Sequence, residues 1–416
     1  MIDVVVAGHL CVDIIPIIAD EATAASESFL APGRLTEVGP AVLSTGGAVS
    51  NTGLSLLRLG IDVRLVARIG DDLIGRLICD ILASHGPQTT QHLAIASGEP
   101  SSYTVVINPP GIDRTFLHYP GTNQTFGPED VPTSLLSQAR LFHFGYPPIM
   151  RRMYADGGHE LCSLFQRAKA QGATTSLDMS MPDPSQPSGR ADWRAILALT
   201  LPYADLFMPS VEEMLYMLWP ERYEQLRRAV GEVRMIDVLE PEEIQHLAEE
   251  ALALGAKIVG LKLGHRGLYL RTAKQLGDLG RGTPAQPGLW AGRELWVPCF
   301  RVKVVGTVGA GDATIAGFLA GLLPKGQGPE EAVVSAVAVG ACSVEAADAT
   351  SGVRPWQETQ ARVARGWARL DAGVAGAGWI WDQVHAVWRG PNDARSRAGG
   401  CAWMENGPGA APGKRR

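Results

Sequence analysis

Apolar runs recur along the chain and alternate with segments whose apolar residues have helical spacing. The first run, residues 2–7, is continuous and ends at Gly8, as expected of a strand buried between two helical layers. Further runs of this kind lie at 63–69, 141–144, 174–177 and 206–208. Strands and helices that alternate in this way predict an α/β fold with a mostly parallel sheet and helices on both faces.

Residues 101–119 break this rhythm. Two extended runs, 103–108 and 115–119, flank a turn rich in Pro and Gly, which predicts a β-hairpin. Because a lone hairpin is marginal in water, we expect it to pair with strands from about 14–42 and to form a small β-sheet lid. A second hairpin is predicted at 257–270.

The two ends of the chain differ in character. We expect residues 1–370 to form one domain and 371–416 to be a C-terminal extension, largely disordered from about 387, where Gly and Pro are frequent. Residues 220–240 read as an insertion that precedes a helix at 242–254.

The most informative stretch is 304–318, VVGTVGAGDATIAGF, which predicts a strand, a tight glycine turn and a helix. The N–H groups at the helix start lie at the positive end of its dipole, so the turn can hold an anion. Gly309 and Gly311 let the backbone approach a phosphate closely. Asp312 falls in the first helical turn and faces this anion site, although an Asp at a helix start is by itself usually a cap.

A second glycine cluster lies far upstream. Gly46 and Gly47 permit a close approach, and Asn51 falls in the first turns of a helix that ends at Gly60. Asp13 lies just beyond the carboxyl end of the first strand, the edge where open α/β sheets bind ligands, but it is also a common turn former.

Composition narrows the functional classes. With 46% hydrophobic and 19% charged residues, the chain reads as globular, and its net charge of −6 gives no electrostatic case for binding nucleic acid or an anionic membrane. The six cysteines form no CxxC pair, no run reaches transmembrane length, and no leader segment is evident. We therefore expect reduced thiols and a cytoplasmic location.

Together, the two glycine clusters resemble the ribokinase/PfkB family of carbohydrate kinases over about residues 1–370. The matching segments are Gly46-Gly47 through Asn51 to Arg58-Leu59-Gly60, Ile69-Gly70-Asp71-Asp72 with Gly75, and Thr307 to Ala313 with Ala316-Gly317-Phe318. The resemblance implies a Rossmann-like three-layer α/β/α core with a β lid. It also implies ATP-dependent phosphorylation of a hydroxyl on a sugar or sugar-like substrate. A nucleoside kinase of the same fold, or a catalytically weak relative that binds such a ligand, is the alternative.

Phosphoryl transfer depends on positioning and charge stabilisation, which these residue types can supply. Asp312 would act as general base and the N–H groups of Gly309, Ala310 and Gly311 as the anion hole. The resemblance implies the remaining roles: acceptor binding by Asp13, Gly46, Gly47 and Asn51, nucleotide binding by Lys262, Gly264 and Thr307, and Mg²⁺ ordered through water by Glu213.

Three positions depart from the family pattern. Gly306 stands where an acidic residue is common, which leaves the use of K⁺ open; Ser210 replaces an Asn three residues before Glu213; and Ser180, after Asp178, stands where an Asn is frequent. The resemblance also implies a homodimer joined lid to lid, with a monomer as the alternative if the turn through Pro109 and Pro110 protects the lid edge.

Overall fold

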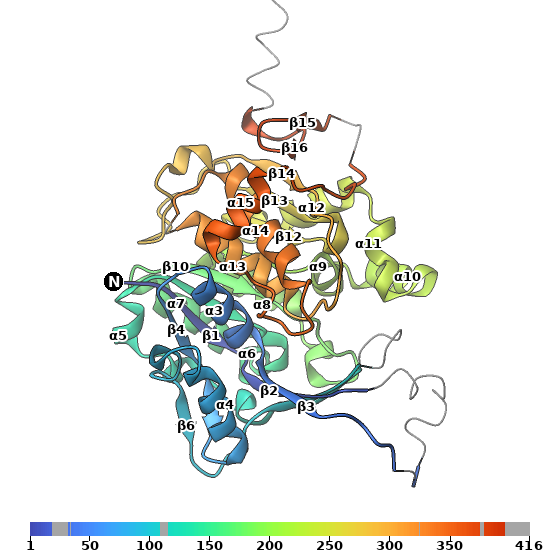
Figure 1. The fold of residues 1–416 in the computed structure, drawn as a ribbon. Helices are drawn as coiled ribbons and strands as arrows, with labels where there is room; N and C mark the ends of the chain where they lie inside the picture. Colours follow the sequence, from blue (N-terminus) through green and yellow to red (C-terminus); the bar gives the residue numbers. More distant parts are fainter. Residues whose placement is uncertain (19–31, 34, 109–114, 324, 375–377, 396–416) are drawn as a thin grey trace, which may run out of the picture.

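The computed structural model describes residues 1–18, 32–33, 35–108, 115–323, 325–374 and 378–395. A ten-stranded sheet forms its centre (Figure 1), with the strand order β15-β16-β14-β13-β12-β11-β10-β9-β1-β4. The strands from β4 to β12 run parallel, which confirms the predicted mostly parallel sheet. Their bounds are β1 (Ile2–Gly8), β4 (Val63–Val66), β9 (Ala139–Gly145), β10 (Thr174–Asp178), β11 (Leu206–Phe207) and β12 (Ile258–Lys262).

Beyond β12 the sheet continues with antiparallel strands. The hairpin predicted at 257–270 is confirmed by β12 and β13, which pair antiparallel. The antiparallel part comprises β13 (Leu268–Thr272), β14 (Glu294–Val297), β15 (Ile380–Asp382) and β16 (Val387–Arg389). A separate pair consists of β5 (Arg68–Gly70) and β6 (Ala94–Ala96).

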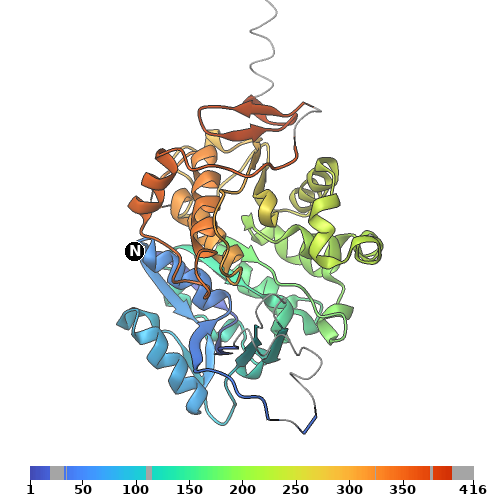
Figure 2. The same cartoon turned by 45° about the vertical axis from the view of Figure 1, so that its right-hand side comes forward.

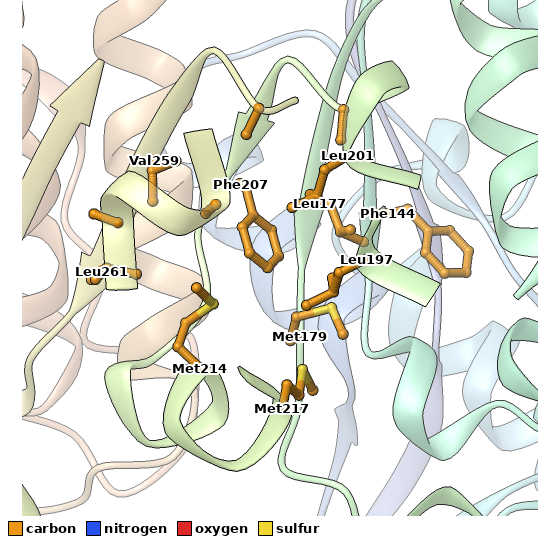
Figure 3. Packing of buried hydrophobic residues seen from close by; sticks show 14 of the residues in the cluster. Phe144, Leu177, Met179, Leu197, Leu201, Phe207, Met214, Met217, Val259 and Leu261 are labelled. Carbon is orange, nitrogen blue, oxygen red and sulfur yellow. The ribbon is translucent and has the colours of Figure 1, made fainter. Parts of the chain in front are cut away.

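Helices cover both faces of the sheet, giving the expected three layers (Figures 1 and 2). Successive residues of β1 alternate between the layers, since Val5 joins one buried cluster and Val4 and Val6 join the other. Figure 3 shows the first cluster, in which Phe207 of β11 lies among Met214 and other side chains from neighbouring helices.

The helices of the first layer are α5 (Thr133–Leu136), α6 (Arg152–Ala155), α7 (His159–Ala170), α8 (Trp193–Thr200), α9 (Val211–Leu218), α10 (Pro220–Val230), α11 (Met235–Val238) and α12 (Pro241–Ala253). Those of the second are α3 (Ala48–Arg58), α4 (Leu73–Ala83), α13 (Ala310–Leu322), α14 (Pro329–Ser343) and α15 (Trp356–Ala364). No helix formed by the described residues is long and apolar enough to cross a membrane.

A second sheet of four strands, in the order β3-β2-β7-β8, projects from this core (Figure 1). Its strands are β2 (Cys11–Pro16), β3 (Ala41–Gly46), β7 (Tyr103–Ile107) and β8 (Thr115–Tyr119). The predicted hairpin therefore pairs with further strands, but these flank the 14–42 segment and overlap only its two ends. The turn through Pro109 and Pro110 lies outside the described residues.

The C-terminal extension is more ordered than the sequence predicts. Disorder from about residue 387 is wrong for residues 387–389, because β16 pairs with β14 and β15 and extends the central sheet. The Arg293 side chain is only 1% exposed and holds this addition, pairing with Asp393 at 2.9 Å and with Glu330 of α14 at 2.6 Å. Local composition cannot reveal partners that lie so far apart along the chain. Residues 396–416 lie outside the described residues.

Candidate active site

Asp312 lies at the beginning of α13, where its side chain is 1% exposed. The residue before the helix, Gly309, has φ +69°, and a Cβ there would come within 2.5 Å of the Ala349 Cβ. Only glycine fits this turn, because any larger residue would be strained in the backbone and would also collide with Ala349. The predicted strand before the turn is not formed, since residues 301–304 have no regular structure.

Three donors hold the Asp312 carboxylate. Its Oδ1 accepts a hydrogen bond from the Thr52 hydroxyl at 3.1 Å, and its Oδ2 accepts bonds from Asn51 Nδ2 at 3.1 Å and the Tyr146 hydroxyl at 2.7 Å. Burial and the negative charge of Asp312 raise the pKa of Tyr146 well above its ordinary value, so Tyr146 remains a donor. A carboxylate has about four acceptor positions, so one position remains for a further donor.

The N–H groups around the start of α13 differ in whether they have an acceptor within the protein. The Ala310 N–H donates to the Thr307 carbonyl at 3.3 Å. In the described part of the chain, the N–H groups of Gly309, Gly311 and Asp312 have no protein acceptor. The available donors at the start of α13 are therefore Gly309, Gly311 and Asp312 rather than Gly309, Ala310 and Gly311.

A buried ion pair lies next to this turn. Lys262, at the end of β12, places its Nζ 2.6 Å from Oδ1 of Asp178, at the end of β10. The Lys262 Nζ is also 3.4 Å from the position that a Cβ on Gly311 would take. Burial alone would lower the pKa of Lys262, but the carboxylates of Asp178 and Glu213 outweigh burial and raise it, so the ammonium stays charged.

The charges around Lys262 favour a divalent cation. Burial raises the pKa of Asp178, and the nearby carboxylates of Glu213 and Asp312 add to this effect while Lys262 opposes it. The Asp178 Oδ2 atom is buried and has no partner among the described residues. When all three carboxyl groups are ionised, the one ammonium leaves two negative charges uncompensated, and oxygen ligands of this type suit Mg²⁺.

Ser210 has a structural role. Its hydroxyl accepts the Glu213 N–H at 3.2 Å, and its own N–H donates to Glu213 Oε2 at 2.7 Å. This reciprocal capping begins α9 and fixes the Glu213 carboxylate near Lys262. The Ser180 hydroxyl, after β10, is buried without a partner among the described residues.

The other glycine cluster makes room for two polar side chains. A Cβ on Gly46 would lie 2.2 Å from Asp13 Oδ2, and a Cβ on Gly47, which has φ +88°, would lie 2.4 Å from His9 Nδ1. Burial raises the pKa of Asp13 to about 6. The His9 Nε2 atom lies 3.3 Å from Nε2 of His118 on β8, so this pair joins the core to the lid.

The three residues predicted to bind nucleotide do not all lie together. Lys262 and Thr307 both lie beside the first turn of α13. Gly264 begins a 3₁₀ turn and contacts the insertion instead, since a Cβ there would lie 3.5 Å from Ile236 of α11. Gly306 offers no side-chain ligand, and a Cβ there would lie 2.9 Å from the carbonyl oxygens of Ala346 and Ala347.

The structure shows contacts of several site residues that the sequence does not indicate. Asn51 was assigned to the acceptor, whereas its amide donates to Asp312 and only its Oδ1 remains without a partner among the described residues. Thr52 and Tyr146 were not singled out at all. Asp178 is the last residue of β10 and Tyr146 follows β9, so both lie at the carboxyl end of a buried strand, the position that also points to Asp13.

The chain was compared with known proteins. Residues 1–356 match the model of a protein family that is described as "pfkB family carbohydrate kinase". An uncharacterized sugar kinase of Archaeoglobus fulgidus is 26% identical over 278 residues, which cover 67% of this chain and 89% of the relative. A 2-dehydro-3-deoxygluconokinase of Thermoproteus tenax is 25% identical over 317 residues, covering 75% and 83%. A putative ribokinase II of E. coli, solved in complex with ATP and Mg²⁺, aligns with a TM-score of 0.62 at 20% identity and covers 88% of this chain and 100% of its own.

Proposed function

The chain belongs to the pfkB family of carbohydrate kinases, and we propose that it transfers the γ-phosphate of ATP to a hydroxyl group of a sugar, with Asp312 as the general base. The observation that carries this proposal is the carboxylate of Asp312, held by three donors at a helix start whose neighbouring N–H groups are free to bind an anion.

In this mechanism the acceptor hydroxyl donates its hydrogen bond to the remaining position on the Asp312 carboxylate. The hydroxyl oxygen forms a bond to the γ-phosphorus, the bond from that phosphorus to the bridging oxygen of ADP breaks, and the proton passes to Asp312. The N–H groups of Gly309 and Gly311 bind the phosphoryl oxygens, and the Lys262 ammonium adds positive charge beside them.

Asp178 and Glu213 would hold Mg²⁺, Asp178 through its unpartnered Oδ2 and Glu213 through water. The ion would neutralise charge on the phosphates. Asp13, Gly46, Gly47 and the free oxygen of Asn51 would surround the acceptor, with the neutral imidazole of His9 beside them. Sugar hydroxyl groups both donate and accept hydrogen bonds, and this set supplies both kinds of partner.

Turnover assays test the proposal. ADP release from Mg-ATP is measured with a panel of pentoses, hexoses, sugar acids and nucleosides. We expect turnover with at least one sugar or sugar derivative. Turnover with nucleosides alone would favour the nucleoside kinase, and saturable sugar binding without turnover would identify a binding protein rather than an enzyme.

Tyr146 is expected to position the base. The Tyr146→Phe variant should lower kcat by about 10- to 100-fold, the usual effect of losing a hydrogen bond to a charged group. The KM for the acceptor should change little, because the lost bond is to Asp312 and not to the substrate. Tyr223→Phe is the matched control, since the Tyr223 hydroxyl donates to the Glu232 carboxylate instead. An unchanged kcat in Tyr146→Phe would show that Tyr146 does not position Asp312.

Asp13 should make acceptor binding sensitive to pH. Because its pKa is raised to about 6, Asp13 is ionised above that pH and protonated below it. Its ability to accept a hydrogen bond from a sugar hydroxyl should therefore decline as the pH falls through about 6. We expect kcat/KM for the acceptor to decrease over this range. The Asp13→Asn variant should have low kcat/KM at every pH and lack this transition; a variant that retains it would assign the transition to another group.

We further propose that the protein is a homodimer joined through its lids. Val42 and Leu43 of β3, an edge strand of the lid sheet, are 46% and 47% exposed. An exposed apolar edge of this kind is usually covered by a partner. Light scattering across a dilution series should give the mass of a dimer for the native protein and of a monomer for Leu43→Glu. A native protein that is monomeric at every concentration would refute this arrangement and leave the kinase proposal intact.

The five described cysteines, Cys11, Cys79, Cys162, Cys299 and Cys342, are free thiols, which supports a location in the reducing cytoplasm.

A further inference from the structure

A groove of about 1230 Å³ lies between the lid and the core. One wall is β8, the other edge strand of the lid sheet. The opposite wall consists of α6 and the 3₁₀ turn Pro147–Ile149, which follow β9, and of the 183–191 segment, which follows β10. All of these core segments follow the carboxyl ends of the strands that supply Tyr146 and Asp178, so the groove opens at the edge of the sheet that holds the site.

Side-chain contacts connect the groove to the general base. His118 lines the groove and contacts His9. The His9 ring centroid lies 6.2 Å from that of Tyr146, whose hydroxyl donates to Asp312. None of the residues that hold the Asp312 carboxylate lines the groove, whose volume exceeds the roughly 300–1,000 Å³ of an ordinary small-ligand pocket, so it offers room beyond the site of transfer.

Two arginines give the groove its charge. Arg151 and Arg190 both line it, and neither forms an ion pair with any described residue. Neighbouring arginines differ in this respect: Arg152 pairs with Glu129 and Glu160, and Arg194 pairs with Glu250. Unpaired guanidinium groups in a groove beside a catalytic site are suited to bind a carboxylate or a phosphate in a bidentate manner.

The other charges on the groove offset only part of the charge of the two arginines. Among the described residues that line it, Asp183 is the only acidic one, and its Oδ1 already accepts the N–H and hydroxyl of Ser185 at 2.8 and 2.7 Å. Burial lowers the pKa of His118, so this imidazole is neutral near pH 7. The groove therefore has a net positive charge although the chain as a whole has a net charge of −6.

We propose that the acceptor is an anionic sugar, whose carboxylate or phosphate is bound by Arg151 and Arg190 while a hydroxyl at its other end reaches Asp312. This inference rests on the proposed kinase function and adds the chemical class of the substrate. Binding energy from the charged end would orient the reacting hydroxyl, because a substrate held at two points has less freedom at the site of transfer.

The experiment compares matched acceptors. The kcat and KM values are measured for fructose and ribose, for gluconate and 2-dehydro-3-deoxygluconate, and for fructose 1-phosphate and fructose 6-phosphate, which separates the carboxylate from the phosphate. The variants are Arg151→Gln, Arg190→Gln and the double substitution. Arg194→Gln is the control, because this nearby arginine is already paired and does not line the groove.

We expect an anionic acceptor to be preferred over the neutral ones. Its KM should rise by about 10- to 100-fold in either single variant, as hydrogen bonds to a charged group are lost. The KM for ATP and the KM for neutral sugars should remain unchanged, and Arg194→Gln should behave as the native protein. Preference for a neutral sugar, or variants that affect every acceptor equally, would overturn the inference but not the kinase function.

Calorimetric titration of gluconate and glucose, and of inorganic phosphate, makes the test independent of turnover. Binding of an anion that is lost in the double variant supports the arginine site even if no acceptor is phosphorylated, an outcome that would count against the kinase proposal alone. Equal binding by the native protein and the double variant, or no binding of any of the anions, would overturn the anion site.

Discussion

Replacing Asp312 with Asn should lower kcat by about 10²- to 10⁴-fold, the usual effect of removing a general base. The substitution preserves shape, and its hydrogen bonds can also be preserved. An amide oxygen in the position of Oδ2 can still accept from Asn51 and Tyr146, while the amide nitrogen can donate to the Thr52 hydroxyl after that hydroxyl rotates. The change therefore removes the base with little disturbance of the site.

Single-turnover and steady-state assays check this expectation, together with calorimetric measurement of ATP binding, which should be retained. Asp71→Asn is the matched control, because Asp71 also follows a glycine but is exposed and bonds to Ser97 and Gly98 away from the site. Near-normal turnover in the Asp312 variant would show that another group accepts the proton.

Removing Glu330 should cause the largest loss of stability. Glu330→Ala would leave the guanidinium of Arg293 buried without its closest partner, and breaking a buried ion pair in this way typically costs about 3–5 kcal/mol. Arg389 of β16 and Arg395 also pair with Glu330, at 3.4 and 3.0 Å, and would lose this partner, so the C-terminal strands should loosen before the rest of the sheet. Urea denaturation followed by tryptophan fluorescence measures the effect, since Trp388 lies on β16 and Trp296 on β14.

Glu224→Ala provides the comparison. Glu224 pairs with Arg227 and Arg228 on the exposed surface of α10, where ion pairs contribute little to stability. A Glu330 variant that is no less stable than the Glu224 variant would mean that the Arg293 cluster has little weight in holding the C-terminal strands.

The parts of this molecule that local sequence determines could be predicted, and those that depend on distant contacts could not. The alternating runs give the parallel strands, and the glycines of 304–318 give a helix start with free N–H groups, because both follow from backbone geometry within a few residues. Asp312 is identifiable for the same reason.

Its partners are not identifiable in this way. Tyr146 donates to Asp312 although the two residues are far apart in the sequence. The pairing of Asp178 with Lys262 requires β10 and β12 to end at the same edge of the sheet. Ser210 differs from these residues: it stands where the family pattern has an Asn, and it caps a helix. Tertiary contacts determine the roles of Tyr146, Asp178 and Lys262, whereas the Ser210 cap is a local contact with Glu213, three residues away.

The C-terminal strands also have a consequence for how the protein is made. β16 covers the edge of β14, and Asp393 is the second carboxylate that pairs with Arg293, yet the ribosome synthesises both after β14 and after Asp312. A nascent chain that already contains Asp312 and both glycine clusters still lacks the strand that covers β14 and one of the two carboxylates that pair with Arg293. Such edges are prone to pair with other chains. Asp312 and both glycine clusters are therefore synthesised before the sheet is complete, and a chain terminated before residue 387 would contain them but leave the edge of β14 uncovered.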